Sequence, residues 1–342
     1  MATARRRNRR LGLAVAVSVG GLAVVAVAGH SLLRQSIDTL GRLDWRWLPL
    51  AIFAEAGSMA AFARAQRKLL QAGGSAPLHL HSVMAVTYAG NAISVSLPLA
   101  GSEVSWAYAY RQFSRRGIER PVVVWALAVS GVFSSLAFAL MLAGGAIATG
   151  NGWDAALGVG GAVVVLVPTL AALSALRYAG VRQLLNRLLD RLVAWSRRLV
   201  NRPGPGAEDA FQRFLDRLAA LRLPRLQYAE VLALATWNWV ADCFCLAIAI
   251  KATGTPIPWQ GLFLAYGAGM TAATLGLTPG GLGVIEAALS AALIAAGLNG
   301  RHALAAVLVY RLVSFWLVIA VGWTIMAIVR RSREPDAALE VS

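Results

Sequence analysis

Five charged side chains stand apart because each lies inside a long apolar stretch of the sequence. They are Glu55, Glu103, Asp242, Glu286 and Arg311, and the neutral polar side chains Asn91, Asn238 and Tyr310 lie in the same stretches. A charge in a hydrocarbon interior costs at least about 2.5–3.5 kcal/mol, so such residues are functional candidates by default. We therefore take them as the residues from which a binding site would be built.

The sharpest local signal is a break at Pro279, Gly280, Gly281 and Gly283 within the apolar stretch 260–297. Proline ends the preceding helix, and glycines permit tight backbone turns. We expect a new half-helix to start at about Gly281 or Leu282. Its free N–H groups and positive dipole end would bind a phosphate or carboxylate. The alternative is a capped, packed hairpin that holds no ligand.

Two charged residues belong to this second break. Glu286 lies in the first turns of the new half-helix, where it would cap the free N–H groups, pair with Arg311 or receive a cationic group. Arg311 lies deep in the last apolar helix, and its planar guanidinium suits a phosphate or a buried carboxylate. A structural pair of Arg311 with Glu286 or Asp242 is the alternative, and the two readings are compatible if the pair opens for substrate.

A weaker break interrupts the stretch 80–110 at Pro98 and Gly101, and Glu103 begins the return half. Asn91 is placed to satisfy backbone carbonyls that this break frees. Elsewhere, Glu55 and Asp242 are candidates for proton or cation sites, or for acids that are hydrogen-bonded to neighbouring helices.

The composition requires a membrane to surround these residues. The chain has 342 residues, of which 58% are hydrophobic and only 14% charged, and its mean hydropathy is +0.62. A soluble domain is nearer half apolar and a quarter charged, so a soluble enzyme, a disordered chain and a disulfide scaffold are excluded. The net charge of +16 comes from arginines at the ends of apolar runs. We expect no nucleic-acid partner.

Six uninterrupted stretches are long enough to cross a bilayer. They are 11–33, 47–63, 121–149, 156–176, 229–250 and 303–329. The basic start and the small residues at 26–28 also fit a cleaved signal peptide, but the apolar run continues beyond them. If these six cross and the two broken stretches turn back, both termini are cytoplasmic. In this topology 26 of the 32 lysines and arginines face the cytoplasm, as the positive-inside rule requires.

The predicted fold is therefore an all-α polytopic membrane protein with about six transmembrane helices and two re-entrant hairpins in an inverted repeat. Residues 1–10 form a basic cytoplasmic N-terminus, 11–149 the first repeat, 156–329 the second repeat and 330–342 a cytoplasmic tail. Residues 177–228 interrupt the second repeat as amphipathic helices on the inner leaflet, whose anionic lipids attract their arginines. Inverted repeats with paired broken segments indicate a transporter site near the bilayer midplane.

Enzymatic signatures are missing from the sequence. The four histidines are scattered, and no Walker A, Gly-x-Ser-x-Gly or His-Glu-x-x-His motif is present. We predict no metal site, no cofactor and no catalytic residue. Cys243 and Cys245 are expected to be free core thiols.

Two motifs carry a family resemblance. The segment 278–286 (TPGGLGVIE), followed by 310–316 (YRLVSFW), resembles the lysylphosphatidylglycerol synthase/flippase transmembrane-domain family. The segment 94–103 (SVSLPLAGSE), followed by 107–111 (AYAYR), is similar to that family's first signature, and the resemblance covers about residues 10–330. It implies an integral membrane domain that, in the best-understood members, moves aminoacylated phosphatidylglycerol to the outer leaflet. Those members also carry an aminoacyl-transferase domain, and we expect none in this sequence because its largest soluble segment, 177–228, is too short for one.

The function we expect is a flippase-like translocase in a bacterial plasma membrane, with anionic or aminoacylated phospholipid as cargo. A small-solute or ion transporter and a non-catalytic membrane partner of a separately encoded lipid-modifying enzyme are the alternatives. A second copy of the chain is a further candidate partner. The expected substrate-binding residues are Arg311, Glu286, Pro279, Gly280, Gly281, Gly283, Glu103, Pro98, Gly101, Asp242, Tyr310 and Asn91.

Overall fold

The computed structural model describes most of the two predicted repeats. The described residues are 41, 43–97, 100–150, 160, 162–163, 167, 225–273 and 278–331. The predicted first span, most of the span at 156–176, the N-terminus, the tail and nearly all of the amphipathic segment lie outside these residues.

The described chain is helical and contains no strand. In chain order the main helices are α3 (Leu48–Ala72), α4 (Leu80–Ser96), α5 (Gly101–Ser114), α6 (Arg120–Ala148), α10 (Arg225–Ala252), α11 (Trp259–Ala273), α12 (Val284–Ala295), α13 (Gly300–Arg311) and α14 (Val318–Arg331). A π-helical segment, Leu312–Leu317, joins α13 to α14, so that Gly300–Val329 continues as one apolar helix.

Local sequence explains several of these helix starts. Prolines stand in the first turn of α3 and of α6, where their missing N–H leaves no intrahelical hydrogen bond unmade. Asn299 caps α13 by accepting a hydrogen bond from the Arg301 N–H at 3.2 Å. These residues set the boundaries that the apolar pattern alone leaves open.

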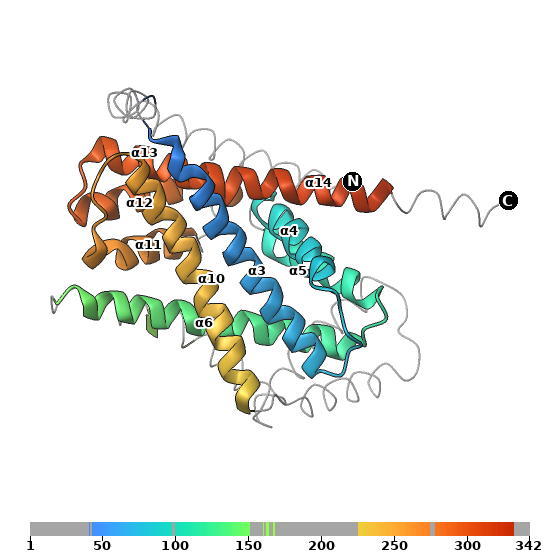
Figure 1. Cartoon of the computed structure of the whole chain (residues 1–342). Helices are drawn as coiled ribbons and strands as arrows, with labels where there is room; N and C mark the ends of the chain where they lie inside the picture. The colour runs from blue at the N-terminus through green and yellow to red at the C-terminus, as the bar shows by residue number, and fades with distance from the viewer. Residues whose placement is uncertain are drawn as a thin grey trace, which may run out of the picture.

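The helices α3 and α10 form the central pair of the described fold and run antiparallel across it (Figure 1). At one end, Lys68 of α3 forms an ion pair with Glu230 of α10. At the other end, the Asp44 N–H just before α3 donates to the Ala252 carbonyl at the end of α10, at 3.0 Å. Contacts at both ends thus fix how α3 and α10, which are far apart in the sequence, lie against each other.

Two helix pairs flank this centre, and each contains one of the predicted breaks. α4 packs against α5, and α11 packs against α12. α4 also lies against α14, while α11 lies against α6. Glycines permit the close approach: a Cβ at Gly322 of α14 would stand 2.4 Å from the Tyr88 carbonyl oxygen of α4, and one at Gly145 of α6 would stand 2.6 Å from the Cβ of Phe263.

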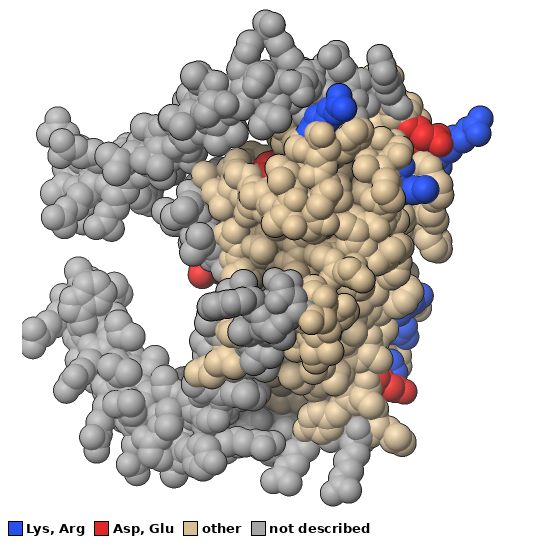
Figure 2. Space-filling model, turned by 90° about the vertical axis from the view of Figure 1, so that its left-hand side faces the viewer, with Lys and Arg blue, Asp and Glu red and all other residues tan. Residues whose placement is uncertain are grey.

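The surface suits a membrane. Three described helices, Arg120–Ala148, Leu226–Ala252 and Gly300–Val329, are long and apolar enough to cross one. Large apolar side chains point outward, among them Phe53 and Ile147, which are 75% and 71% exposed. In the face shown in Figure 2, uncharged residues dominate and lysines and arginines occupy only a few places. Such a surface would be a liability in water and is ordinary in contact with lipid.

The contact between α4 and α14 generates a stability prediction. Gly322→Ala places a methyl group against the Tyr88 backbone and is expected to cost about 1–3 kcal/mol through overpacking. Gly131→Ala is the matched control, because Gly131 lies in α6 with open space around its Cβ position; alanine there is expected to stabilise the helix by up to about 1 kcal/mol. Thermal unfolding in detergent measures both, and equal midpoints for the two variants would contradict this packing.

Candidate functional site

The turn between α11 and α12 is built by glycines. Gly280, Gly281 and Gly283 have φ values of 57°, 67° and 82°, in the left-handed region that other residues rarely adopt. The Thr278 hydroxyl closes the turn by donating to the Leu282 carbonyl at 2.8 Å. α12 consequently begins at Val284, slightly later than the predicted start at Gly281 or Leu282, because these glycines hold the backbone out of the helix as far as Gly283.

Glu286 caps the new helix. Its Oε2 accepts a hydrogen bond from the Gly283 N–H at 2.6 Å, and it lies in the first turn of α12. A carboxylate at this end satisfies a free N–H group and interacts favourably with the helix dipole. The capping role predicted for Glu286 is therefore present in the structure.

Arg311 connects this cap to the turn. Its Nε donates to Glu286 Oε1 at 2.7 Å, and its Nη2 donates to the Gly280 carbonyl at 2.7 Å. The guanidinium also lies over the ring of Phe315, 4.0 Å from the ring centroid. With the residue only 7% exposed, these contacts compensate part of the cost of burying its charge.

Gly280 must be a glycine for two reasons, its left-handed backbone and the nearby ring of Phe315. A Cβ at Gly280 would stand 2.0 Å from Phe315 Cε2. The left-handed backbone and the ring thus exclude a side chain at the position whose carbonyl accepts from Arg311. Phe315 itself lies in the π-helical segment that follows Arg311, and π-helical turns are frequent at functional sites.

A second polar cluster surrounds Asp242 of α10. Tyr266 of α11 donates to Oδ2 at 2.5 Å, and Tyr310 of α13 donates to Oδ1 at 2.9 Å. The Glu55 carboxyl of α3 is also a hydrogen-bond partner of Asp242. Tyr266, Tyr310 and Glu55 are 0%, 2% and 3% exposed. Because Tyr310 directly precedes Arg311, α13 contributes one residue to each of the two polar clusters.

The structure brings together only part of the predicted site. Arg311, Glu286, Gly280 and Gly283 form one cluster, and Asp242 and Tyr310 form the next. Gly281 lies buried in the same turn, where a Cβ would meet the side chain of Ile285. The backbone of Pro279 begins that turn.

The predicted residues of the first break are placed differently. Glu103 is exposed and accepts a hydrogen bond from Ser102, and Asn91 directs its amide nitrogen to Met59 Sδ at 3.7 Å rather than to a carbonyl of the break. Gly101 is buried, and a Cβ there would stand 1.9 Å from the Ser94 carbonyl oxygen. Pro98 lies outside the described residues. α4 nevertheless contacts the turn Pro279–Gly281, which brings the first helix pair to the second break.

Two residues of these clusters were not singled out from the sequence. Phe315 stands four positions after Arg311, a spacing that places both on one face of a helix and offered a usable signal. Tyr266 carries a hydroxyl inside an apolar run, and a buried tyrosine hydroxyl usually has a partner. The identity of that partner depends on how α10 and α11 pack, which no local pattern specifies.

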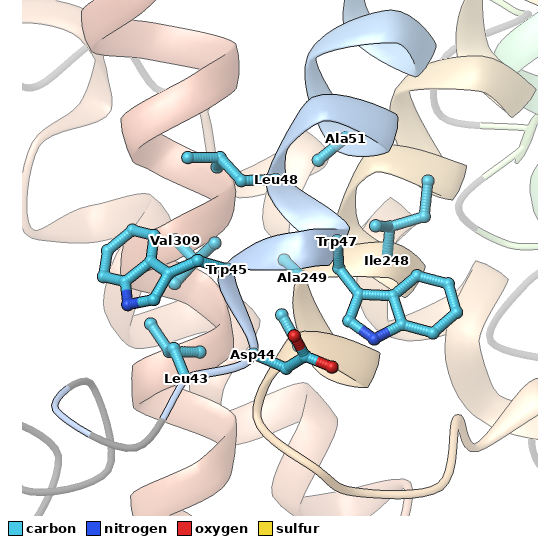
Figure 3. A pocket seen from close by; sticks show the side chains of 10 residues that line it. Leu43, Asp44, Trp45, Trp47, Leu48, Ala51, Ile248, Ala249 and Val309 are labelled. Atoms are coloured by element: carbon cyan, nitrogen blue, oxygen red, sulfur yellow. The ribbon is translucent and has the colours of Figure 1, made fainter.

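A small surface depression lies at the end of the central pair where α3 begins and α10 ends (Figure 3). It is lined by Leu43, Asp44, Trp45, Trp47, Leu48, Ala51, Ile248, Ala249, Ala252 and Val309. Its lining is almost entirely apolar, so it offers little to a charged headgroup. The chemistry of the described residues therefore concentrates at Arg311 and Asp242 instead.

The Arg311 cluster can bind an anion without a metal. An arginine, a helix N-terminus and glycine backbone are the groups that hold phosphate or carboxylate in many proteins, and Glu286 occupies that role in the described state. Among the described residues, no group of three or more histidine, cysteine or acidic side chains is arranged to hold a metal ion.

Comparison with known proteins gives one match. The sequence model of the family described as lysylphosphatidylglycerol synthase TM region matches residues 11–322, which is most of the chain. No curated protein matches the chain.

The buried ion pair generates a second stability prediction. Arg311→Met leaves the largely buried Glu286 uncompensated and Glu286→Gln leaves the buried Arg311 uncompensated, so each is expected to cost about 3–5 kcal/mol. The double variant is expected to cost clearly less than the sum, because neither charge then remains unpaired. Unfolding in detergent measures this double-mutant cycle.

The exposed pair Lys68–Glu230 is the control for that cycle. Both side chains are about half exposed, at 42% and 52%, and exposed pairs contribute at most about 1 kcal/mol. Additive losses at Arg311 and Glu286, no larger than those at Lys68 and Glu230, would show that the buried pair has no special weight.

Proposed function

We propose that this chain, which belongs to the lysylphosphatidylglycerol synthase TM-region family, is a lipid translocase of a bacterial plasma membrane. Its cargo would be an anionic or aminoacylated phospholipid, or another lipid-linked headgroup, moved between the two leaflets. The proposal assigns the chain no covalent chemistry. The observation that carries it is the buried Arg311–Glu286 pair at the break before α12.

Moving a lipid headgroup through hydrocarbon requires a polar path, because desolvating a phosphate is very costly. Arg311 is the twelfth residue of the helix Gly300–Val329. At 1.5 Å per residue it lies about 16 Å from the helix start, roughly the middle of a 30 Å hydrocarbon core. A cation held at that depth, beside a helix N-terminus, is where a midplane headgroup site would be needed.

The packing supports an inverted repeat. In such a repeat, α3 corresponds to α10, α4 to α11, α5 to α12, and α6 to the long helix α13–α14. The helix contacts follow this correspondence: the contact of α4 with α14 corresponds to that of α11 with α6, and the contact of α4 with α5 to that of α11 with α12. The contact of α3 with α10 corresponds to itself. The antiparallel course of α3 and α10 is what two oppositely oriented repeats require (Figure 1). In this arrangement the helix pairs α4–α5 and α11–α12 are the two re-entrant hairpins.

The charges of the described helices support the orientation. Basic residues gather where α3 ends, where α5 ends and where α6 begins: Arg64, Arg67, Lys68, Arg111, Arg115, Arg116 and Arg120. The opposite ends carry Arg46, Lys251 and Arg301. The positive-inside rule therefore places the first group at the cytoplasm, with Trp45 and Trp259, both exposed, at the outer interface.

The same pair accounts for resting and transporting states. With no cargo, Glu286 satisfies Arg311 and closes the site. An arriving phosphate would replace Glu286 on the guanidinium, while Glu286 keeps its cap on Gly283 or receives the amine of an aminoacyl headgroup. Rocking of the two repeats would then open the site to the other leaflet.

Leaflet exchange of labelled lipids in proteoliposomes tests this function. The purified chain is expected to transfer an anionic or aminoacylated phosphatidylglycerol faster than empty vesicles do. Arg311→Ala is expected to lower the rate strongly, because it removes the phosphate donor. Arg311→Lys retains a charge without the planar donor pair, and its transfer rate is expected to lie between those of the unsubstituted chain and of Arg311→Ala.

The control variant is Arg46→Ala, an exposed arginine of the outer end that lies outside both clusters. Thermal unfolding of each variant before reconstitution distinguishes lost transfer from lost folding. Transfer no faster than in empty vesicles for every anionic and aminoacyl lipid would refute the translocase. Normal lipid transfer by a folded Arg311→Ala variant would show that the Arg311 site takes no part in transport.

A further inference from the structure

The interface of α3 and α10 contains an acid pair that the headgroup site does not use. Glu55 of α3 is 3% exposed, its carboxyl is a hydrogen-bond partner of Asp242, and its Oε2 is buried without any partner. An unpartnered carboxyl oxygen in such a place is costly unless the group is neutral or binds a ligand. A bound proton or another ligand is therefore needed to make this acid pair stable in the interior.

The hydrogen bonds assign roles to the two acids. Both oxygens of Asp242 accept from tyrosine hydroxyls, Oδ2 from Tyr266 and Oδ1 from Tyr310. Phenol donors favour an ionised acceptor, so Asp242 is the carboxylate of the pair. Glu55 has no donor directed to it among the described contacts and is the member that carries a hydrogen to share with Asp242.

The groups around the pair provide too few ligands for a metal ion. The titratable groups that interact electrostatically with Glu55 are Asp242 and Cys245 on α10, Tyr88 on α4 and Tyr310 on α13. Those that interact with Asp242 include Tyr266 on α11 and Arg311. None of the other groups named here is a carboxylate, so Glu55 and Asp242 supply the two carboxyl groups of the site, and both oxygens of Asp242 are already engaged. Hard metal cations take about six or more oxygen ligands, whereas a proton needs only the two carboxyl oxygens.

A polar contact continues from the pair along the same interface. Asn238, one helical turn from Asp242, donates to the Ser58 hydroxyl at 2.7 Å, and Ser58 is one turn from Glu55. These residues lie on the cytoplasmic side of the pair in the orientation proposed above. They would be the next polar groups toward that side for a proton that leaves Glu55.

We propose that Glu55 and Asp242 form a proton-binding site whose occupancy is linked to headgroup binding at Arg311. The proton resides on Glu55 and is shared with Asp242; its release to water leaves two carboxylates. This inference rests on the proposed function only for the linkage, and the proton site itself does not require lipid transfer.

Electrostatics gives the direction of the linkage. With the proton bound, the set Asp242, Glu286, Arg311 and Glu55 carries one net negative charge, and without it the set carries two. A phosphate at Arg311 adds further negative charge a short distance away, since Tyr310 joins Asp242 to the residue before Arg311. Proton and anionic headgroup therefore favour each other's binding, as reciprocal linkage requires.

Infrared spectroscopy of the purified chain tests the proton site without any transport. The spectrum at neutral pH is expected to contain the C=O stretch of a protonated, hydrogen-bonded carboxylic acid, and Glu55→Gln is expected to remove it. Glu230→Gln is the matched control, an exposed glutamate of α10, and is expected to leave the band. Asp242→Asn provides a second variant: it keeps the Glu55 proton but alters its acceptor, so the band should shift rather than vanish.

Lipid transfer tests the linkage. Lowering the pH on the side from which the lipid departs is expected to speed transfer by the unsubstituted chain, while Glu55→Gln, permanently neutral, is expected to transfer lipid at a rate that does not respond to pH. The proton site would be overturned if the band were absent or if it survived in Glu55→Gln. It would also be overturned if the band appeared only when sodium is replaced by choline, because a sodium ion would then occupy the site. An intact band with no lipid transfer would instead refute the proposed function alone.

Discussion

A buried guanidinium is the constraint on which the second half of the described fold depends. Arg311 lies deep in an apolar helix, and its charge is tolerated because acceptors arrive from two other segments: the Glu286 carboxylate from α12 and the Gly280 carbonyl from the turn before it. The turn can present that carbonyl only because Gly280 adopts a left-handed conformation and leaves space for Phe315. The break in the helix, its glycines and the arginine are therefore parts of one solution to one electrostatic problem.

Under the proposed function, the same residues would form a binding site with two arrangements. Glu286 caps α12 with one oxygen and holds Arg311 with the other, so an anion that displaces it from Arg311 need not disrupt the helix. One residue earlier, Tyr310 contacts Asp242, which links the arginine to the acid pair between α3 and α10. Headgroup binding and protonation would then be coupled through adjacent residues of one helix, and the π-helical segment that follows provides a place where that helix can change its winding.

Charge and hydropathy were sufficient to predict the helical membrane class and the order of the described helices, and they limited the structural partners of Arg311 to Glu286 or Asp242, of which the structure has Glu286. They were sufficient because a charge inside an apolar run is costly and must be compensated locally or by another such charge. Boundaries were less accurate: α3 continues to Ala72, past the predicted end at Ala63, because a helix does not stop where its residues become charged. The contacts of Asp242 with Tyr266, of Asn91 with Met59 and of Gly280 with Phe315 depend on how helices cross, which the sequence pattern does not encode.

The most direct test of the central claim is to locate the lipid headgroup on the protein. A phosphatidylglycerol that carries a photoreactive group on its headgroup can be crosslinked in proteoliposomes, and mass spectrometry of the digested protein identifies the labelled peptides. The account predicts labelling of the segment around Gly280–Glu286 and of the segment around Arg311, with both reduced in Arg311→Ala and competed by unlabelled phosphatidylglycerol. Labelling confined to the ends of the helices, unaffected by that variant, would contradict it.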